Sequence, residues 1–364
     1  MLQNFAWICT WKITHRCNLS CTYCDHAVMK PATAVERIDH DKIIDTIAKF
    51  SPKIVNISGG EPTLVEQLPR IVEKLKKRWN PFIRVVHNGS LPHKGIGLFP
   101  HIDRFVVSLD GPGEVNRATR GIDGDKVIER LGAIADEAAA HNVELAINCV
   151  VTVHNVSHIR ELAEKTRSAS AQILLSLTPV MPPRGALSVL SKPGGYEAFE
   201  RMYAELKSKG YRIMHTFDSL MRHETFSCIQ CYNQYFVIRI SPEGRVSACP
   251  MNVPLATAVE GISPKSLLSP KKAKKVLKAG FRLLKSKLPS RIDFSCSTIC
   301  NCESWLDMLF LGKESESADV YLRGLKGRMT EKDYRELDKF VRKNINAGFS
   351  VEEFRRRIEE VTAE

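Results

Sequence analysis

The feature that most constrains the fold is the alternation of six short β-rich runs with amphipathic helical runs between residues 7 and 180. The β-rich runs cover residues 7–13, 53–58, 82–87, 103–109, 143–153 and 173–177. Val, Ile and Leu dominate them, which is typical of strands that are buried on both faces of a parallel sheet. The pattern therefore predicts an α/β fold built on a parallel sheet.

Amphipathic helices are expected between these runs. The first expected helix begins at Asp39 or Asp41 and ends at Phe50, because Asp is a favoured N-cap residue. Further helices are expected over 64–79, 124–141 and 196–209, and after Asn155. The last 50 residues are rich in Glu, Arg and Lys and have helical periodicity, so we expect one or two solvated helices there.

Glycine and polar residues stand at the carboxyl ends of the predicted strands. These residues are, in chain order, Gly59, Gly60, Glu61, Asn88, Ser108 and Asp110. Parallel α/β sheets and barrels bind their ligands at this edge. Glycine allows a close approach of backbone, so the Gly59-Gly60 turn is expected to approach a ligand. The sequence thus predicts a ligand site at the carboxyl edge of the sheet.

Three cysteines, Cys17, Cys21 and Cys24, follow the first predicted strand with the spacing C-x3-C-x2-C. Three thiolates on one short loop can hold three irons of a cubane cluster and leave the fourth iron open, whereas a closed cluster takes four cysteines. A zinc knuckle or a disulfide staple is the alternative. The spacing lacks the paired C-x2-C knuckles of a zinc ribbon, and clustered cysteines favour metal sites over disulfides.

The cysteine spacing and the Gly59-Gly60-Glu61-Pro62 turn together resemble the radical S-adenosylmethionine (radical SAM) superfamily. The resemblance implies a partial (β/α)6 TIM-like barrel and a [4Fe–4S] cluster whose open iron binds SAM. It also implies that an electron from the cluster cleaves SAM into methionine and a 5′-deoxyadenosyl radical. A reductant such as ferredoxin or flavodoxin would supply that electron.

The resemblance also implies which residues contact SAM. The turn at Gly59, Gly60 and Glu61 would meet the amino group, and Ser108 and Asp110 would bind ribose hydroxyls or the carboxylate. The remaining implied contacts are Asn88, Arg120, Asn148 and Leu177. The sequence leaves open whether Arg120 binds a carboxylate or is a surface arginine at the start of a helix.

A second group of cysteines follows in the last third of the chain. Its members are Cys228, Cys231, Cys249, Cys296, Cys300 and Cys302. A hairpin with strands at 235–240 and 245–248 is expected between them. The arrangement resembles the auxiliary SPASM or Twitch domains of some radical SAM enzymes, which implies at least one auxiliary [4Fe–4S] cluster. The preferred ligands are Cys228, Cys231, Cys249 and Cys300, with Cys296 and Cys302 as alternatives. The sequence does not decide between this cluster, a second and incompletely ligated cluster beside it, and a zinc site.

These patterns divide the chain into four parts. We expect a radical SAM barrel over 1–185, a linker and helix over 186–215, a cysteine-rich α+β domain over 216–310, and C-terminal helices over 311–364. A basic insert at 261–292 contains no Asp or Glu, and its helical periodicity places apolar residues on one face. This helix either packs on the protein or binds an anionic substrate or a membrane surface.

The net charge of +12 also favours an anionic partner, but the chain carries no recognised nucleic-acid-binding motif. No signal peptide or apolar run of membrane-spanning length is present, so a cytoplasmic protein, peripheral to the membrane at most, is expected.

The resemblance implies an enzyme that abstracts hydrogen from a substrate. Peptide or protein maturation is the preferred function. A lipid-linked, phosphorylated or other small-metabolite substrate is the alternative, and a non-enzymatic iron–sulfur electron carrier is the remote one.

Overall fold

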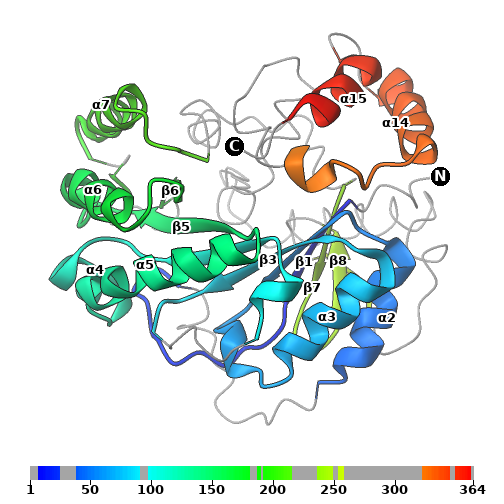
Figure 1. The fold of residues 1–364 in the computed structure, drawn as a ribbon, viewed down its shortest axis with the longest axis horizontal. Helices are drawn as coiled ribbons and strands as arrows, with labels where there is room; N and C mark the ends of the chain where they lie inside the picture. Colours follow the sequence, from blue (N-terminus) through cyan, green and yellow to red (C-terminus); the bar gives the residue numbers. More distant parts are fainter. Residues whose placement is uncertain are drawn as a thin grey trace, which may run out of the picture.

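The computed structural model describes residues 7–24, 38–90, 97–180, 187–189, 192–214, 236–248, 253–257, 322–344 and 349–361. Its centre is a sheet that crosses the middle of the molecule (Figure 1). In the described part of the chain this sheet has nine strands in the order β6-β5-β4-β3-β2-β1-β7-β8-β9. The first six strands are β1 (Ile8–Lys12), β2 (Ile54–Ser58), β3 (Phe82–His87), β4 (Arg104–Ser108), β5 (Glu144–Val151) and β6 (Leu174–Pro179). All neighbours among these six are parallel, which confirms the predicted partial barrel.

Helices follow these strands as the sequence predicts. They are α2 (His40–Phe50), α3 (Leu68–Trp79), α4 (Gly113–Arg120), α5 (Gly124–Ala140), α6 (Ile159–Ala169) and α7 (Gly195–Ser208). Short 3-10 helices lie at η2 (Pro62–Leu64), η3 (Phe99–His101) and η4 (Val156–His158). The Asp39 side chain caps α2 by accepting from the backbone N–H of Lys42. Two details differ from the prediction. Helix α4 was not expected, and α3 begins at Leu68 because η2 precedes it.

The expected hairpin is confirmed as β7 (Val237–Ile240) and β8 (Arg245–Ala248), and β9 (Val253–Thr257) pairs with β8. Strand β7 also pairs in parallel with β1, with Ile8 opposite Val237 and Thr10 opposite Arg239. The hairpin therefore extends the barrel sheet. The domain limits drawn from the sequence stay predictions.

The two faces of the sheet pack against different helices. Alternate residues such as Trp11, Val55 and Phe105 lie in one core cluster with the buried residues of α2, α3, α5 and α6, and we call this side the outer face. The residues between them, such as Ile8 and Val106, lie in a second cluster, and we call that side the inner face.

The C-terminal helices α14 (Glu331–Asn344) and α15 (Val351–Glu360) supply much of the second cluster. Figure 1 shows them on the opposite side of the sheet from α2 and α3. Phe354 is 1% exposed and stacks on Trp7, with ring centroids 6.0 Å apart. The expectation that these helices are simply solvated is therefore wrong, because one side of each helix packs into the inner face.

The inner face is arranged in rows across neighbouring strands. At the amino end of the sheet, Arg104 pairs with Glu144, whose Oε1 is also 2.7 Å from the Nη2 of Arg323. The next inner row is apolar and consists of Val86, Val106, Ala146 and Leu174. The row after that, nearer the carboxyl edge, consists of Ser108, Asn148 and Ser176, and we call it the polar row. C-terminal residues thus cover the amino end of the inner face, and the polar side chains lie towards the predicted ligand edge.

No helix in the described part of the chain combines the length and the apolar character that a membrane span requires.

Replacing Phe354 by Ala should lower the free energy of unfolding by about 3–5 kcal/mol, because the substitution removes a buried aromatic ring from the inner core. Thermal and urea denaturation measure the change. Glu359→Ala, on an exposed position of the same helix, is the matched control and should alter stability by no more than about 0.5 kcal/mol. Equal stability of the Phe354→Ala variant and the wild type would contradict this packing of α15.

Candidate functional site

The three cysteines of the C-x3-C-x2-C motif lie on the segment that leaves the carboxyl end of β1. Cys17, Cys21 and Cys24 are partly exposed, and their thiols form no disulfide. The backbone N–H of Cys24 donates to the carbonyl oxygen of Cys21 at 3.0 Å, and the N–H of Leu19 lies 3.5 Å from the Sγ of Cys17. The loop is therefore locally folded, and each of its three cysteines is only partly exposed. We call residues 13–24 the cysteine segment.

The Gly59-Gly60 turn lies directly against the cysteine segment. The N–H of Gly60 donates to the carbonyl oxygen of Thr14 at 2.8 Å, and the N–H of Glu61 donates to that of Arg16 at 2.7 Å. A Cβ at Gly60 would lie 2.1 Å from the carbonyl oxygen of Arg16, and a Cβ at Gly59 would lie 2.6 Å from that of Thr14. The sequence predicted a close approach to a ligand. In the structure, the backbone that requires both glycines is the chain's own, just before Cys17.

The Glu61 carboxylate is fully buried and connects two strand ends. Its Oε1 accepts from the backbone N–H of Thr63 at 3.0 Å and from the Thr63 hydroxyl at 2.6 Å, which caps η2. Its Oε2 accepts from the backbone N–H of Asn88 at 2.7 Å, at the end of β3. Burial raises the pKa of Glu61, and the hydrogen bonds from Thr63 and Asn88 oppose that rise. The Glu61 side chain thus holds the turn in place.

Side chains at the end of β3 also bind the cysteine segment. Asn88 Nδ2 donates to the Oδ1 of Asn18 at 2.8 Å and lies 3.9 Å from the Sγ of Cys17. Asn18 Nδ2 donates to the Ser90 hydroxyl at 2.7 Å, and that hydroxyl donates to the Oδ1 of Asn88 at 2.6 Å. This closed set of hydrogen bonds fixes the first part of the loop. Asn18 and Ser90 were missed in the sequence because only the fold brings them together.

The end of β4 holds the last part of the loop through Asp110. The carboxylate of Asp110 is fully buried. Its Oδ2 accepts from the Tyr23 hydroxyl at 2.5 Å and lies 2.8 Å from the Nε of Arg120. Its Oδ1 accepts from the Nη2 of Arg120 and from the backbone N–H of Val150, both at 2.9 Å. The loop, α4 and β5 therefore meet at one carboxylate.

Arg120 lies at the end of α4 and is 5% exposed, so the alternative of a surface arginine at a helix start is wrong. Its guanidinium carbon also lies 5.5 Å from the centre of the Tyr23 ring. Burial alone would lower the pKa of Arg120, but the charge of Asp110 and further acidic groups around it raise the pKa above its ordinary value. Arg120 is therefore charged next to the cysteine loop.

The thiols have the chemistry that an iron–sulfur cluster requires. Burial raises the pKa of Cys21 to about 11, and the positive charge of Arg120 opposes that rise. Iron binds the thiolate, so a nearby cation favours the ligand form. No three His, Cys, Asp or Glu side chains in the described ranges gather around one point as ligands of a single ion would. A cubane cluster binds each thiolate at a separate iron, so three spaced cysteines fit it.

The other predicted SAM contacts lie on different sides of the sheet. Ser108 and Asn148 are neighbours in register on the inner face. Leu177 is fully buried in the core of the outer face, so its side chain points away from them. The inner-face residue of β6 at this level is Ser176, which pairs in register with Asn148. The two-residue alternation of strands, applied to β6, would have identified Ser176.

The β7–β8 hairpin contacts the cysteine segment as well, because the Nε2 of His15 lies 2.5 Å from the Oε1 of Glu243 in its turn.

The predicted auxiliary ligands lie outside the described residues; they are Cys228, Cys231, Cys249, Cys296, Cys300 and Cys302. The basic insert at 261–292 also lies outside them.

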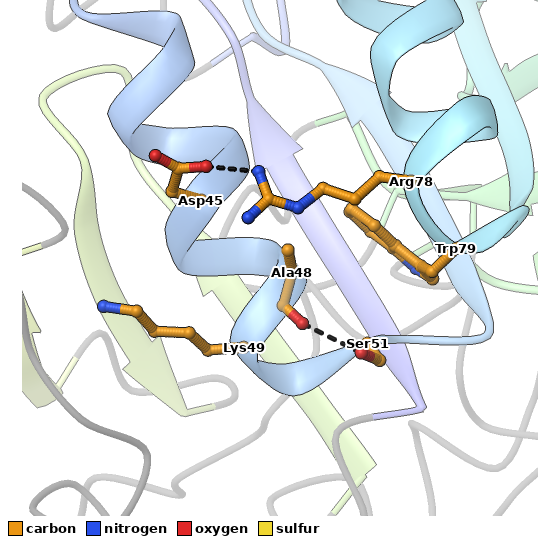
Figure 2. Close-up of a pocket in the computed structure, with 6 residues that line it drawn as sticks. All are labelled: Asp45, Ala48, Lys49, Ser51, Arg78 and Trp79. Atoms are coloured by element: carbon orange, nitrogen blue, oxygen red, sulfur yellow. Dashed lines mark hydrogen bonds and ion pairs between the residues drawn. The ribbon is translucent and has the colours of Figure 1, made fainter.

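A surface pocket lies away from this site, between the carboxyl ends of α2 and α3 (Figure 2). Asp45 and Arg78 form an ion pair across it, and the Ser51 hydroxyl donates to the carbonyl oxygen of Ala48 at 2.8 Å. Helices in such a sheet run back from the carboxyl ends of the strands, so this pocket is at the amino edge. It shares no residue with the cysteine site.

The comparison with known protein families is consistent with a cluster site at the cysteine segment. Residues 11–166, which include the cysteine segment, the last two residues of β1 and the whole of β2 to β5, match the family model of the radical SAM superfamily. This stretch of the chain therefore resembles a radical SAM domain. The match supports the predicted enzyme class and the two predicted cofactors, a [4Fe–4S] cluster and SAM. The matched residues end before the second group of cysteines, so the number of auxiliary clusters stays a prediction.

One similar protein is mycofactocin maturase MftC of Mycobacterium ulcerans, which is 28% identical over 265 residues. The match covers 67% of this chain and 68% of that protein.

Two solved structures share the fold. Streptococcus suis SuiB bound to precursor peptide SuiA has a TM-score of 0.51 at 16% identity, over 68% of this chain and 60% of SuiB. The anSMEcpe structure with bound AdoMet and Cp18Cys peptide has a TM-score of 0.55 at 19% identity, over 83% of this chain and 95% of that one. The match with SuiB covers 60% of that protein, which is less than two thirds of its length.

Replacing Gly60 by Ala should displace the cysteine segment, because the new Cβ would collide with the Arg16 carbonyl oxygen. After anaerobic reconstitution, the iron content of this variant should fall to that of a Cys17→Ala/Cys21→Ala/Cys24→Ala variant. Gly132→Ala is the matched control, because Gly132 lies in α5 with open space where its Cβ would be. Wild-type iron content in the Gly60→Ala variant would show that the turn does not position the loop.

Proposed function

We propose that this chain cleaves SAM reductively at a cluster held by Cys17, Cys21 and Cys24 and uses the resulting radical to modify a peptide or protein. The observation that carries the proposal is the fixation of the cysteine segment at the carboxyl edge by three successive strand ends. Cys17, Cys21 and Cys24 would hold the cluster, which would supply the electron for cleavage of SAM to methionine and a 5′-deoxyadenosyl radical. That radical would take a hydrogen atom from the substrate and become 5′-deoxyadenosine.

The residues around the loop have distinct proposed tasks. The backbone of the Gly59-Gly60-Glu61 turn and the Asn88 amide would face the amino acid part of SAM, beside Cys17. Ser108 and Asn148 would bind its nucleoside part from the inner face. Both oxygens of Asp110 already accept hydrogen bonds within the protein, and Arg120 pairs with Asp110. We therefore assign these two residues to positioning the loop in place of the SAM contacts predicted for them.

Three similarities support a peptide or protein substrate. MftC is a maturase, SuiB is bound to a precursor peptide, and anSMEcpe is bound to a peptide together with AdoMet. The fold of this chain is similar to the folds of SuiB and anSMEcpe. The β7–β8 hairpin, which belongs to the region expected to hold auxiliary ligands, contacts the cysteine segment through Glu243 and His15.

We also propose one auxiliary [4Fe–4S] cluster in the 216–310 region, with Cys228, Cys231, Cys249 and Cys300 as ligands and Cys296 and Cys302 as alternatives. A small reductant such as ferredoxin or flavodoxin would deliver electrons. The basic insert would bind an anionic part of the substrate or a membrane surface, in a protein that is otherwise cytoplasmic.

The cleavage step predicts that the reconstituted full-length protein forms 5′-deoxyadenosine and methionine from SAM and dithionite under anaerobic conditions. The Cys17→Ala/Cys21→Ala/Cys24→Ala variant should form neither, because it retains the downstream cysteines but no site for the open iron. Liquid chromatography with mass spectrometry quantifies both products. A wild-type protein with intact clusters that forms no 5′-deoxyadenosine would overturn the enzyme assignment.

The same assay tests the substrate class. The peptide fraction of source cells grown on deuterated amino acids is added, and deuterium in 5′-deoxyadenosine reports abstraction of substrate hydrogen. Digesting this fraction to amino acids beforehand should abolish the enrichment. Enrichment that survives digestion would instead favour a lipid-linked, phosphorylated or other small-metabolite substrate.

A further inference from the structure

The polar row on the inner face consists of two hydroxyl side chains on either side of an amide. Ser108, Asn148 and Ser176 are paired directly in register on β4, β5 and β6. Neighbouring strands lie about 4.8 Å apart, so adjacent side chains in the row can reach two adjacent groups of one ligand. The row contains no charged residue, so it suits a neutral polyol better than a carboxylate or an ammonium group.

The two serine side chains are nearly buried and lack protein partners. Ser108 is 6% exposed and Ser176 is 2% exposed. Within the described ranges, neither hydroxyl forms a hydrogen bond with another residue. Neither Oγ is among the fully buried, unpartnered side-chain atoms of the described residues, so each oxygen keeps a small surface that a ligand could reach. These two hydroxyls are therefore available for a hydrogen bond with a ligand that lies over the inner face.

The position of the row indicates which ligand that is. Ser108 lies two residues before Asp110, whose carboxylate binds Tyr23 of the cysteine segment. The apolar row of Val106, Ala146 and Leu174 lies one step further from the carboxyl edge and packs against the C-terminal helices. If the amino acid part of SAM lies at the cysteine segment, its nucleoside part would extend over β4 towards β6, along the polar row.

We infer that Ser176 binds a ribose hydroxyl of SAM, side by side with Ser108 and Asn148. This inference rests on the proposed function and adds a residue on β6 that the sequence motifs pass over in favour of Leu177. Ser176 would contribute binding and orientation of the cofactor, and no proton transfer.

The test compares SAM with its 2′-deoxy and 3′-deoxy analogues on the reconstituted full-length enzyme, by equilibrium dialysis. Ser176→Ala should weaken SAM binding about threefold to tenfold, the range expected for one hydrogen bond to an uncharged group. The loss should disappear with the analogue that lacks the hydroxyl bound by Ser176. Ser176→Thr should restore affinity, because it keeps the hydroxyl. Ser168→Ala, on the exposed side of α6, is the control and should bind SAM like the wild type.

Three results would overturn the inference. The first is wild-type affinity of Ser176→Ala for SAM, and the second is an equal loss for SAM and both deoxy analogues, which would indicate a general disturbance of β6. Absence of SAM binding by the wild-type enzyme is the third, and it would overturn the proposed function as well. The first two results leave the proposed function intact, so the two failures are distinguishable.

Discussion

The site depends on one buried carboxylate, that of Asp110. It accepts hydrogen bonds from the Tyr23 hydroxyl, the Arg120 guanidinium and the backbone N–H of Val150. A buried carboxylate is stable only when it is paired and hydrogen-bonded, and here the partners come from three separate parts of the chain. The cysteine loop, α4 and β5 are therefore held together as one unit. The backbone contact between the N–H of Thr22 and the carbonyl oxygen of Thr119, at 2.9 Å, belongs to the same junction.

The other strand ends complete this arrangement. The glycine turn after β2 receives the start of the cysteine segment, and the Asn18–Asn88–Ser90 hydrogen bonds bind it to the end of β3. Three thiols are thereby presented at the edge of a sheet whose opposite end is covered by C-terminal helices. A reactive radical requires a site that excludes water. Among the described residues, the C-terminal helices pack at the amino end of the inner face, and the polar row lies towards the carboxyl edge, where we propose that SAM binds. The geometry thus connects a rigid fold to the chemistry proposed for it.

Much of this could be predicted from the sequence, because strand periodicity and loop motifs are local signals. The six parallel strands and the places where their polar residues stand follow from that periodicity. Helix α4 was missed because it is short and polar and begins directly after Pro112. The tasks of Asp110 and Arg120 were missed because their pairing depends on the fold. Leu177 was chosen from a motif position, whereas strand alternation puts Ser176 on the inner face. The C-terminal helices looked solvated because charged residues surround the few apolar positions, such as Phe354, that pack.

Hydrogen exchange of the metal-free, full-length Asp110→Asn variant tests the central claim most directly. This substitution keeps the shape of the side chain and removes the charge that pairs with Arg120. We expect backbone amides in residues 14–24 and 113–120 to exchange at least about tenfold faster than in the wild type, since breaking a buried ion pair is strongly destabilising. Amides in α15 should exchange at the wild-type rate, because α15 packs far from the junction against Trp7. Unchanged exchange in residues 14–24 would contradict the claim that Asp110 holds the cysteine loop.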